Sequence, residues 1–516
     1  MSGQPRAHTA EGVVAGRWRG EHAVFRGIPY ARPPVGQLRF QAPAPVEGWD
    51  GTRQATEFGP VVPQAGPTAE DSAGNDWLTL NVSTPALGSA GLPVLVWIHG
   101  GAYIAGASSD PMYDPAALTS AGLVVVSINY RVAAEGFVLV GGAPANRGFL
   151  DQIAALEWVR RNIAAFGGDP DQVTVAGQSA GAGSIAAMLT MERARGLFRR
   201  AIAHSVPGSL CTRALAEEVA AVLADRIGAA PDAEALSGID PSRLAGELTA
   251  LGADLSGHRQ RWGRLAQTGV AVCPVLDGTV LTEPPWRALA DGRTGGIELL
   301  VGHTRDEFRL FSVMMGRLGT FTEAEARTAL DLFAPAPDGA DAYRAAYPQA
   351  TWEELLELVY SDALFRMPSL RLAQTNQAAG GTSFLFELRL AASASAAGGA
   401  LGACHSLDVP LAFGTLDSPV GQYAFGDRPA PEVSAASREL RGGWVRFAMT
   451  GDPGWPAHEP ERALTRVLDV ESQTVPYPEE ASRRIWEGHD PDPFDVTGRC
   501  VERSQTVAGR SRRSPS

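Results

Sequence analysis

Short runs of apolar, often β-branched residues alternate along the chain with stretches of helical periodicity. Each run has the length of a strand and none alternates between apolar and polar positions: residues 93–98, 123–129, 173–176, 201–205, 298–302 and 384–388. Such continuous apolar runs are typical of strands in a sheet that is covered on both faces. The pattern predicts an α/β fold with a large, mostly parallel central sheet flanked by helices.

The clearest helix lies between two of these runs. Ile153, Leu156, Val159 and Ile163 are spaced by three or four residues, which predicts an apolar stripe along one helix face. The sequence GGDP that follows should end this helix. At the start of the chain, the glycine-punctuated residues 12–31 predict an antiparallel hairpin at the sheet edge.

We expect one domain over residues 10–495. Residues 209–345 are mainly helical and rich in alanine, and we interpret them as a helical insertion that covers the functional site. They are not expected to form a separate domain, because the predicted strand at 298–302 lies inside them and belongs to the main sheet. Residues 393–402 predict a mobile loop, and residues 500–516 predict a disordered tail.

Composition and charge exclude several classes of function. The 516 residues include 44 basic and 57 acidic ones, so the net charge is −13, and 45% are hydrophobic, which is enough for a large core. An acidic chain with no basic run before its last residues is not expected to bind nucleic acid. No stretch approaches the roughly 20 apolar residues of a membrane helix, and the N-terminus lacks a signal-peptide core. These features predict a cytoplasmic protein.

The four cysteines, Cys211, Cys273, Cys404 and Cys500, are scattered and form no CxxC pair. This spacing argues against a zinc site and against a disulfide framework. We therefore expect free thiols.

Ser179 lies in the sequence GQSAG, directly after the predicted strand 173–176 and before an apolar helical run. A GxSxG turn between a strand and a helix holds its serine on a tight bend, where only small flanking residues avoid the neighbouring backbone. The serine hydroxyl is then exposed at the positive end of a helix. Its placement makes Ser179 a candidate nucleophile.

A second glycine-rich turn, HGGAY, follows the predicted strand 93–98. Neighbouring parallel strands bring this turn and the GQSAG turn to the same end of the sheet. The backbone amides of Gly101, Ala102 and Ala180 are therefore candidates for an oxyanion hole, where a hydrolase needs preorganised donors.

Several stretches spread from about residue 10 to about residue 495 share one resemblance. GFLDQIAALEWVRRNIAAFGGDPDQVTVAGQSAGA spans residues 148–182, and it is accompanied by FRGIPYARPPVGQLRF, LTLNV, WIHGGAY, INYR, RDEF and GACHSLDVP. Together these motifs resemble the type-B carboxylesterase and cholinesterase family of α/β hydrolases, in particular bacterial para-nitrobenzyl-esterase-like members. The resemblance implies the α/β-hydrolase fold.

The resemblance also implies a catalytic triad of Ser179 as nucleophile, Glu307 in RDEF as acid and His405 in GACHSLD as base. Their order along the chain is that of α/β hydrolases. Independently of the resemblance, Glu307 and His405 each follow a predicted strand, and open α/β sheets build their sites at such strand ends. Serine is a poor nucleophile by itself, so an imidazole must take its proton and a carboxylate must orient that imidazole.

Other residues compete for these roles. Asp306 and Glu307 could both be solvated acids that open a helix, His204 could be the base, and Asp408 could orient His405. A histidine that ends a buried strand is more often a satisfied core residue. The alignment to the family favours Glu307 and His405.

The chain departs from the family pattern at several positions. Relatives outside the cell have a first disulfide whose cysteines would fall at about Val62 and Trp77, and its absence here agrees with a reducing compartment. Relatives commonly have Glu where this chain has Gln178, and Ser-Gly-Ser where it has Ser205-Val206-Pro207. Pro207 has no hydrogen-bonding side chain, so support for the triad acid must come from another residue.

Two phenylalanines bear on the substrate pocket. Relatives commonly have glycine directly after the triad acid, where this chain has Phe308, and often a bulky acyl-pocket residue at the position of Phe311. If the ring of Phe308 points inward, it narrows the pocket and favours short acyl groups. If it points outward, it is an ordinary core residue.

These observations predict a serine carboxylic ester hydrolase that acts through an acyl-enzyme on small to medium esters. No metal and no organic cofactor are needed for this chemistry. An acyltransferase or amidase with the same triad is the alternative, followed by a catalytically silent binding protein, although silent members typically lose a triad residue. The expected partner is a small-molecule ester, with no nucleic acid and no membrane, and the chain is expected to be a monomer or a weak homo-oligomer.

Overall fold

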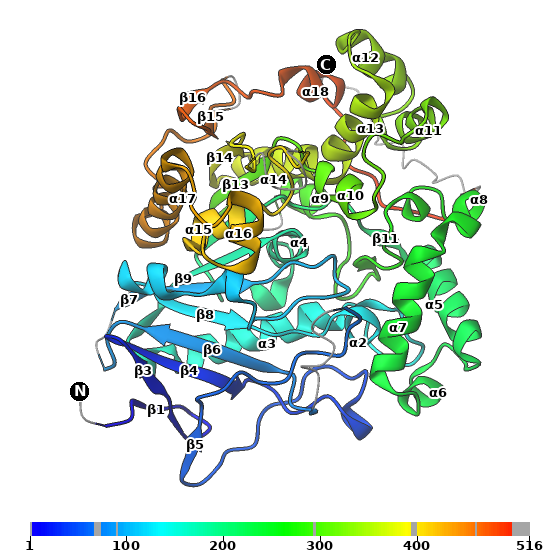
Figure 1. Ribbon diagram of the computed structural model, residues 1–516. Coiled ribbons are helices and arrows are strands. Elements are labelled where there is room, and N and C mark those ends of the chain that lie inside the picture. The colour runs from blue at the N-terminus through cyan, green and yellow to red at the C-terminus, as the bar shows by residue number, and fades with distance from the viewer. Residues whose placement is uncertain are drawn as a thin grey trace, which may run out of the picture.

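A computed structural model describes residues 3–66, 74–88, 91–292, 296–393, 400–459 and 462–497. Within these residues the main sheet has eleven strands (Figure 1). In spatial order they are β16 (Gln473–Val475), β15 (Thr465–Leu468), β14 (Thr382–Leu388), β13 (Glu298–Thr304), β10 (Arg200–His204), β9 (Gly168–Gln178), β7 (Leu92–Ile98), β8 (Val124–Ile128), β6 (Thr79–Thr84), β4 (His22–Pro29) and β3 (Arg17–Arg19).

The middle of this sheet is parallel, as predicted. Strands β15, β14, β13, β10, β9, β7 and β8 pair in parallel, whereas β16 on one side and β6, β4 and β3 on the other are antiparallel. All six apolar runs of the sequence coincide with strands of this block. The edge hairpin is confirmed for β3 and β4. Residues 13–15 instead form β2, which joins β1 (Arg6–His8) and β5 (Thr52–Gln54) in a small separate sheet.

The described residues also contain eighteen α-helices. Their bounds are α1 (Ala116–Ser120), α2 (Ala133–Phe137), α3 (Arg147–Asn162), α4 (Ala180–Met188), α5 (Arg213–Ile227), α6 (Ala233–Ser237), α7 (Pro241–Ala253), α8 (Arg259–Trp262), α9 (Pro285–Ala290), α10 (Arg309–Met314), α11 (Glu323–Phe333), α12 (Gly339–Ala346), α13 (Trp352–Ser361), α14 (Met367–Ala378), α15 (Asp408–Phe413), α16 (Pro419–Phe425), α17 (Pro431–Thr450) and α18 (Glu480–Ile485).

Both faces of the sheet are buried, which explains the continuous apolar runs. Along β7, Val94, Val96 and Ile98 belong to one hydrophobic cluster, while Leu95 and Trp97 belong to the cluster on the opposite face. The first cluster includes the apolar stripe of α3, and the second includes residues of α15 and α17. Alternate residues of one strand thus enter two different cores, so every position of the strand must be apolar.

Helix α3 carries the predicted stripe and stops where the sequence predicts. Ile153, Leu156 and Val159 are buried, and a short 3₁₀ turn, Ile163–Phe166, continues the chain to Gly167. Gly167 adopts φ = 85°, a left-handed conformation that favours glycine at a helix end. Strand β9 then begins at Gly168 and leads to the GQSAG turn.

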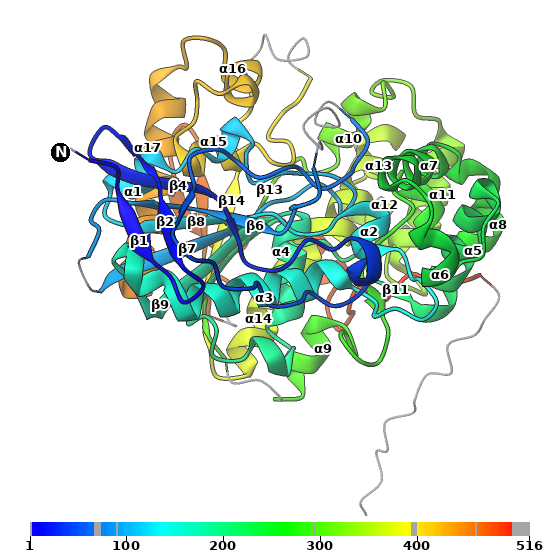
Figure 2. The same cartoon turned by 90° about the horizontal axis from the view of Figure 1, so that it is seen from below.

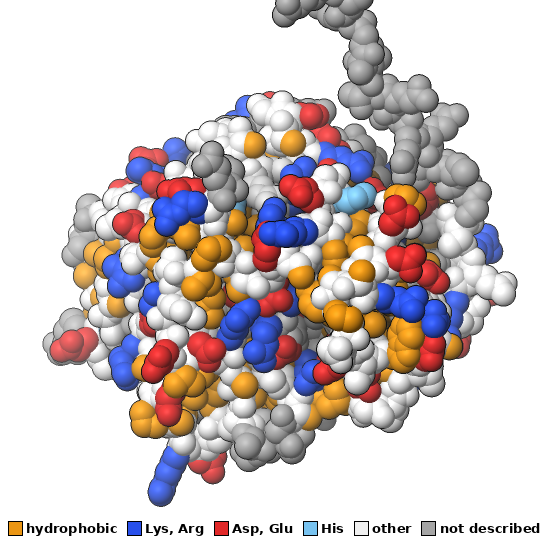
Figure 3. Space-filling model, turned by 90° about the horizontal axis from the view of Figure 1, so that it is seen from above, with side chains coloured by type: hydrophobic (Ala, Val, Ile, Leu, Met, Phe, Trp, Pro, Cys, Tyr) orange, Lys and Arg blue, Asp and Glu red, His pale blue; other side chains and the backbone are white. Residues whose placement is uncertain are grey.

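The first four helices of the predicted insertion, α5 to α8, lie on one side of the molecule. Figures 1 and 2 both place α5 to α8 on the side opposite α17. On the face seen in Figure 3, acidic and basic side chains are interspersed. No helix in the described part of the chain is long and apolar enough to cross a membrane. Residues 394–399 of the predicted loop and the predicted tail at 500–516 lie outside the described residues.

Candidate active site

Ser179 occupies a sharp turn between β9 and α4. Its backbone angles are φ = 54° and ψ = −124°. The neighbouring glycine positions have no room for a side chain. A Cβ atom on Gly181 would lie 2.0 Å from the carbonyl oxygen of Ile98, and one on Gly177 would lie 2.7 Å from the carbonyl carbon of Gly181. The small residues of the GxSxG sequence are therefore required by the close approach of β7 to this turn.

Glu307 and His405 are in direct contact. Glu307 follows β13, His405 precedes α15, and Nδ1 of His405 lies 2.5 Å from Oε2 of Glu307. The carboxylate is fully buried. Its other oxygen, Oε1, accepts hydrogen bonds from Ser205 Oγ at 2.6 Å and from the Thr304 amide at 2.8 Å. A buried carboxylate needs such donors to offset its lost hydration.

Ser205 donates to Glu307 the hydrogen bond that the side chain of Pro207 cannot provide. It is the first residue of the Ser-Val-Pro triplet, it follows β10, and it adopts φ = 54°. This conformation directs its hydroxyl to Glu307 on the neighbouring strand end. The signal for this role was present in the sequence, because the first serine of the family's Ser-Gly-Ser pattern is retained, but its partner depends on the pairing of β10 with β13.

The imidazole of His405 is enclosed by aromatic rings and by Gln178. Its centroid lies 4.4 Å from the ring of Phe365 and 5.3 Å from that of Phe311. Nε2 of His405 lies 3.0 Å from Nε2 of Gln178. Among the described residues, no hydrogen bond joins the hydroxyl of Ser179 to the ring. Ser179 and His405 nevertheless line the same cavity, and bonds of this kind are often loose before substrate binds.

The competing residues pair with one another or with surface groups. Nδ1 of His204 lies 2.7 Å from Asp408, and its Nε2 accepts a hydrogen bond from Trp444. Both His204 and Asp408 are buried, so His204 is a satisfied core histidine. Asp306 pairs with Arg305 and accepts a hydrogen bond from the amide of Ala403.

Cys404 precedes His405 but is poorly suited to act as a nucleophile. Burial, together with the nearby charge of Glu307, raises the pKa of the Cys404 thiol to about 12. The thiol is therefore protonated at neutral pH, and a protonated thiol is a weak nucleophile.

Three backbone amides line the same cavity as Ser179. Gly101 and Ala102 adopt φ = 115° and 53°, and Ala180 is the first residue of α4. A Cβ atom on Gly101 would lie 2.1 Å from the carbonyl oxygen of Ala105, so this turn needs glycine. Within the described residues these three amides donate no hydrogen bond. They are thus free to bind an oxyanion at this end of the sheet.

The cavity at Ser179 has a volume of about 540 Å³ and a largely apolar wall. Phe308 and Phe311 both line it, as do residues 268–270 from the predicted insertion. Phe308 is also buried and stacks on Tyr360 at 4.3 Å between ring centroids. Phe308 therefore meets both sequence interpretations: it packs in the core, and it also borders the cavity.

The prediction of free thiols is wrong for two of the cysteines. Cys211 and Cys273 form a disulfide, with Cα atoms 6.1 Å apart, and Cys404 is free. Two short strands bring them together, because β11 (Cys211–Thr212) pairs in parallel with β12 (Val275–Leu276). The cysteines are 62 residues apart, so no local sequence motif predicts this pairing.

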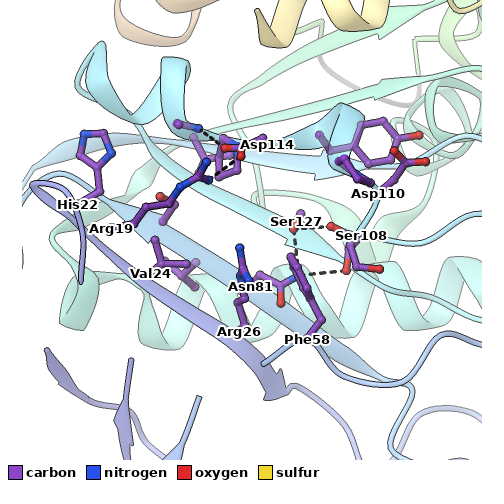
Figure 4. Close-up of a pocket in the computed structure, with 18 residues that line it drawn as sticks. Arg19, His22, Val24, Arg26, Phe58, Asn81, Ser108, Asp110, Asp114 and Ser127 are labelled. Atoms are coloured by element: carbon purple, nitrogen blue, oxygen red, sulfur yellow. Dashed lines mark hydrogen bonds and ion pairs between the residues drawn. The ribbon is translucent and has the colours of Figure 1, made fainter. Parts of the chain in front are cut away.

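A second hollow, of about 220 Å³, lies on another part of the sheet and shares no lining residue with the first (Figure 4). Arg19 pairs there with Asp114 at 2.5 Å, and Asn81 donates to Ser108 and Ser127. These polar groups satisfy one another, and the hollow lacks the histidine-carboxylate contact of the first cavity.

Comparisons with known proteins agree with this geometry. The model of the carboxylesterase family matches residues 3–479. The para-nitrobenzyl esterase of Bacillus subtilis (strain 168) is 34% identical over 496 residues, which cover 92% of this chain and 97% of that protein. The phenmedipham hydrolase of Pseudarthrobacter oxydans has the same identity and the same coverage.

Solved structures show the same likeness. The carboxylesterase EST55 of Geobacillus stearothermophilus superposes with a TM-score of 0.82 at 35% identity, over 93% of this chain and 99% of that one. A structure of PNB esterase gives a TM-score of 0.81 at 34% identity, with the same coverage. The fold is the α/β-hydrolase fold that the sequence predicts.

Proposed function

Because this chain belongs to the carboxylesterase family and is a carboxylic ester hydrolase, we propose that Ser179, His405 and Glu307 carry out its reaction. The observation that carries the proposal is the contact of Glu307 with Nδ1 of His405, because His405 lines the same cavity as Ser179. A carboxylate at Nδ1 leaves Nε2 of the ring as the base.

In this mechanism the hydroxyl oxygen of Ser179 attacks the ester carbonyl, and Nε2 of His405 takes the hydroxyl proton. The ring then gives that proton to the departing alcohol, which leaves an acyl group on Ser179. Water, deprotonated by the same nitrogen, attacks the acyl-enzyme and releases the acid. Glu307 stabilises the positive charge of the ring at both steps.

The amides of Gly101, Ala102 and Ala180 bind the oxyanion that forms at each tetrahedral intermediate. Their lack of other acceptors among the described residues supports this role. One donor of this kind contributes about 10²- to 10³-fold to kcat.

The substrates are small to medium esters with apolar groups, and residues 209–345 cover the site as an insertion in one domain that spans residues 10–495. The cavity of about 540 Å³ and its apolar wall, partly from residues 268–270, support both statements. Phe308 and Phe311 border the acyl group and limit its length.

The first experiment replaces Ser179 with Ala. Turnover of chromogenic esters and covalent labelling by a fluorophosphonate should both be lost, while the melting temperature stays near that of the wild type. Mass spectrometry of the labelled wild type should place the probe on Ser179. Labelling of another serine would contradict the assignment, and a panel of esters of graded acyl length would define the substrate.

A cytoplasmic location and a monomeric or weakly associated state are also proposed. Cell fractionation and size-exclusion chromatography test them. The disulfide between Cys211 and Cys273 removes one of the arguments for a reducing compartment.

A further inference from the structure

Gln178 precedes Ser179 in the chain, contacts His405 and has no part in the mechanism above. It is the last residue of β9, directly before Ser179, and its side chain is buried. Its Nε2 lies 3.0 Å from Nε2 of His405, and it lines the same cavity as both residues.

The proton positions follow from the partners of the ring. The Glu307 carboxylate only accepts hydrogen bonds, so Nδ1 of His405 carries a proton toward it, and Nε2 of the neutral ring carries a lone pair. The amide nitrogen of Gln178 is a donor. It therefore donates to the lone pair that must take the proton of Ser179.

The ring does not need Gln178 to hold its orientation. Glu307 fixes it at Nδ1, and the rings of Phe311 and Phe365 pack against it. The side-chain oxygen of Gln178 lies beside Gly100, where a Cβ atom would come within 3.0 Å of it. The contact to His405 is thus an addition to a ring that is already positioned.

We propose that Gln178 is a positioning residue that occupies the base nitrogen of His405 in the free enzyme and so restrains the activation of Ser179. Two donors, the amide of Gln178 and the hydroxyl of Ser179, compete for one acceptor. The serine is activated only in the fraction of molecules where the amide has released the ring. This inference rests on the proposed roles of Ser179 and His405.

Two variants separate this role from a structural one. Gln178→Met keeps a similar length but donates no hydrogen bond, so labelling of Ser179 by a small fluorophosphonate should become about 2- to 10-fold faster at neutral pH. Gln178→Glu puts an acceptor beside the ring and favours its protonated form, which cannot act as a base. Its labelling should be slow at neutral pH and should recover toward alkaline pH.

Gln152→Met is the matched control. Gln152 is a buried glutamine of α3 that donates to Ser184 and does not touch His405. Its replacement should lower the melting temperature without accelerating the labelling. If Gln178→Met and Gln178→Glu slow the labelling by the same factor at every pH, the role of Gln178 is structural and the proposal is overturned.

The labelling readout also separates this proposal from the proposed function. A wild-type enzyme that is labelled at Ser179 but hydrolyses no ester would contradict the proposed function. The labelling rates of the wild type and the Gln178 variants would still test the proposed role of Gln178. A wild type that is not labelled at Ser179 would overturn both.

Discussion

The carboxylate of Glu307 has no access to water and is satisfied entirely inside the protein. Ser205, the amide of Thr304 and His405 provide its contacts. These contacts compensate the buried carboxylate for its lost hydration, and a carboxylate in this place can stabilise a positive charge on the neighbouring ring. In the proposed mechanism, the contacts from Ser205 to Glu307 to His405 orient the ring for proton transfer.

Glu307→Gln tests this charge. An amide can still hold the ring but cannot stabilise its positive form, and kcat should fall by on the order of 10⁴ while the protein remains folded. Steady-state kinetics with a chromogenic ester and a melting curve measure both. Asp306→Asn and Asp408→Asn are the comparisons, and a larger loss of kcat in either would mean that another carboxylate orients His405.

At the level of elements, the segment from Glu307 into α10 joins the proposed triad to the pocket wall. Phe308 directly precedes α10, stacks on Tyr360 of α13 and borders the cavity. One side chain thus couples helix packing to pocket size, and its replacement should affect both.

Phe308→Ala should raise kcat/KM for long acyl esters relative to acetate esters, because it removes a ring from the cavity wall. A pocket separates substrates by about 1–3 kcal/mol for each methylene that it excludes. The same change should lower stability by about 3–5 kcal/mol through the lost packing on Tyr360. Kinetics across an ester series and denaturant unfolding measure the two effects. An equal loss of kcat/KM for all esters would mean that Phe308 acts only through core packing.

At the scale of the whole molecule, a disulfide joins two points that both lie within the predicted insertion, residues 209–345. Cys211 lies just before α5, and Cys273 lies beside the cavity, so the bond closes the stretch that contains α5 to α8. A cross-link of this length restricts the unfolded chain strongly.

Replacement of both Cys211 and Cys273 with Ser should lower the free energy of unfolding by about 2–4 kcal/mol. Dithiothreitol should lower the melting temperature of the wild type but not that of the double variant. Cys404→Ser serves as the control for loss of a free thiol. A wild-type melting temperature that does not respond to reduction would show that the two cysteines are not joined.

The stability of the whole fold should also depend on pH. Burial lowers the pKa of His99, His303 and His458 to about 4, and burial with the nearby charge of Glu479 raises the pKa of Glu387 to about 7. Between about pH 4 and 6.5 the unfolded state binds more protons at the three histidines, so stability falls as pH falls. Glu387 binds its proton preferentially in the folded state and opposes this trend.

Unfolding by denaturant at pH 5 and pH 7 should therefore show a lower stability at pH 5. Glu387→Gln removes the opposing group and should make the dependence on pH steeper. An unchanged dependence in this variant would mean that Glu387 does not bind a proton preferentially in the folded protein.

Local sequence patterns determined the strands, helix α3 and its end, and the turn at Ser179. These features depend on residues close together in the chain: apolar periodicity, and glycines where the backbone approaches closely. The strand ends also indicated which end of the sheet carries Glu307 and His405, because parallel strands of α/β folds present their carboxyl ends together.

Contacts between distant residues were decided only by the tertiary structure. Ser205 reaches Glu307 because β10 pairs with β13, and Cys211 meets Cys273 because β11 pairs with β12. Gln178 lies against His405, 227 residues away in the chain. Such partners depend on strand order, on register and on the direction of individual side chains, and the periodicity of a single segment contains none of these.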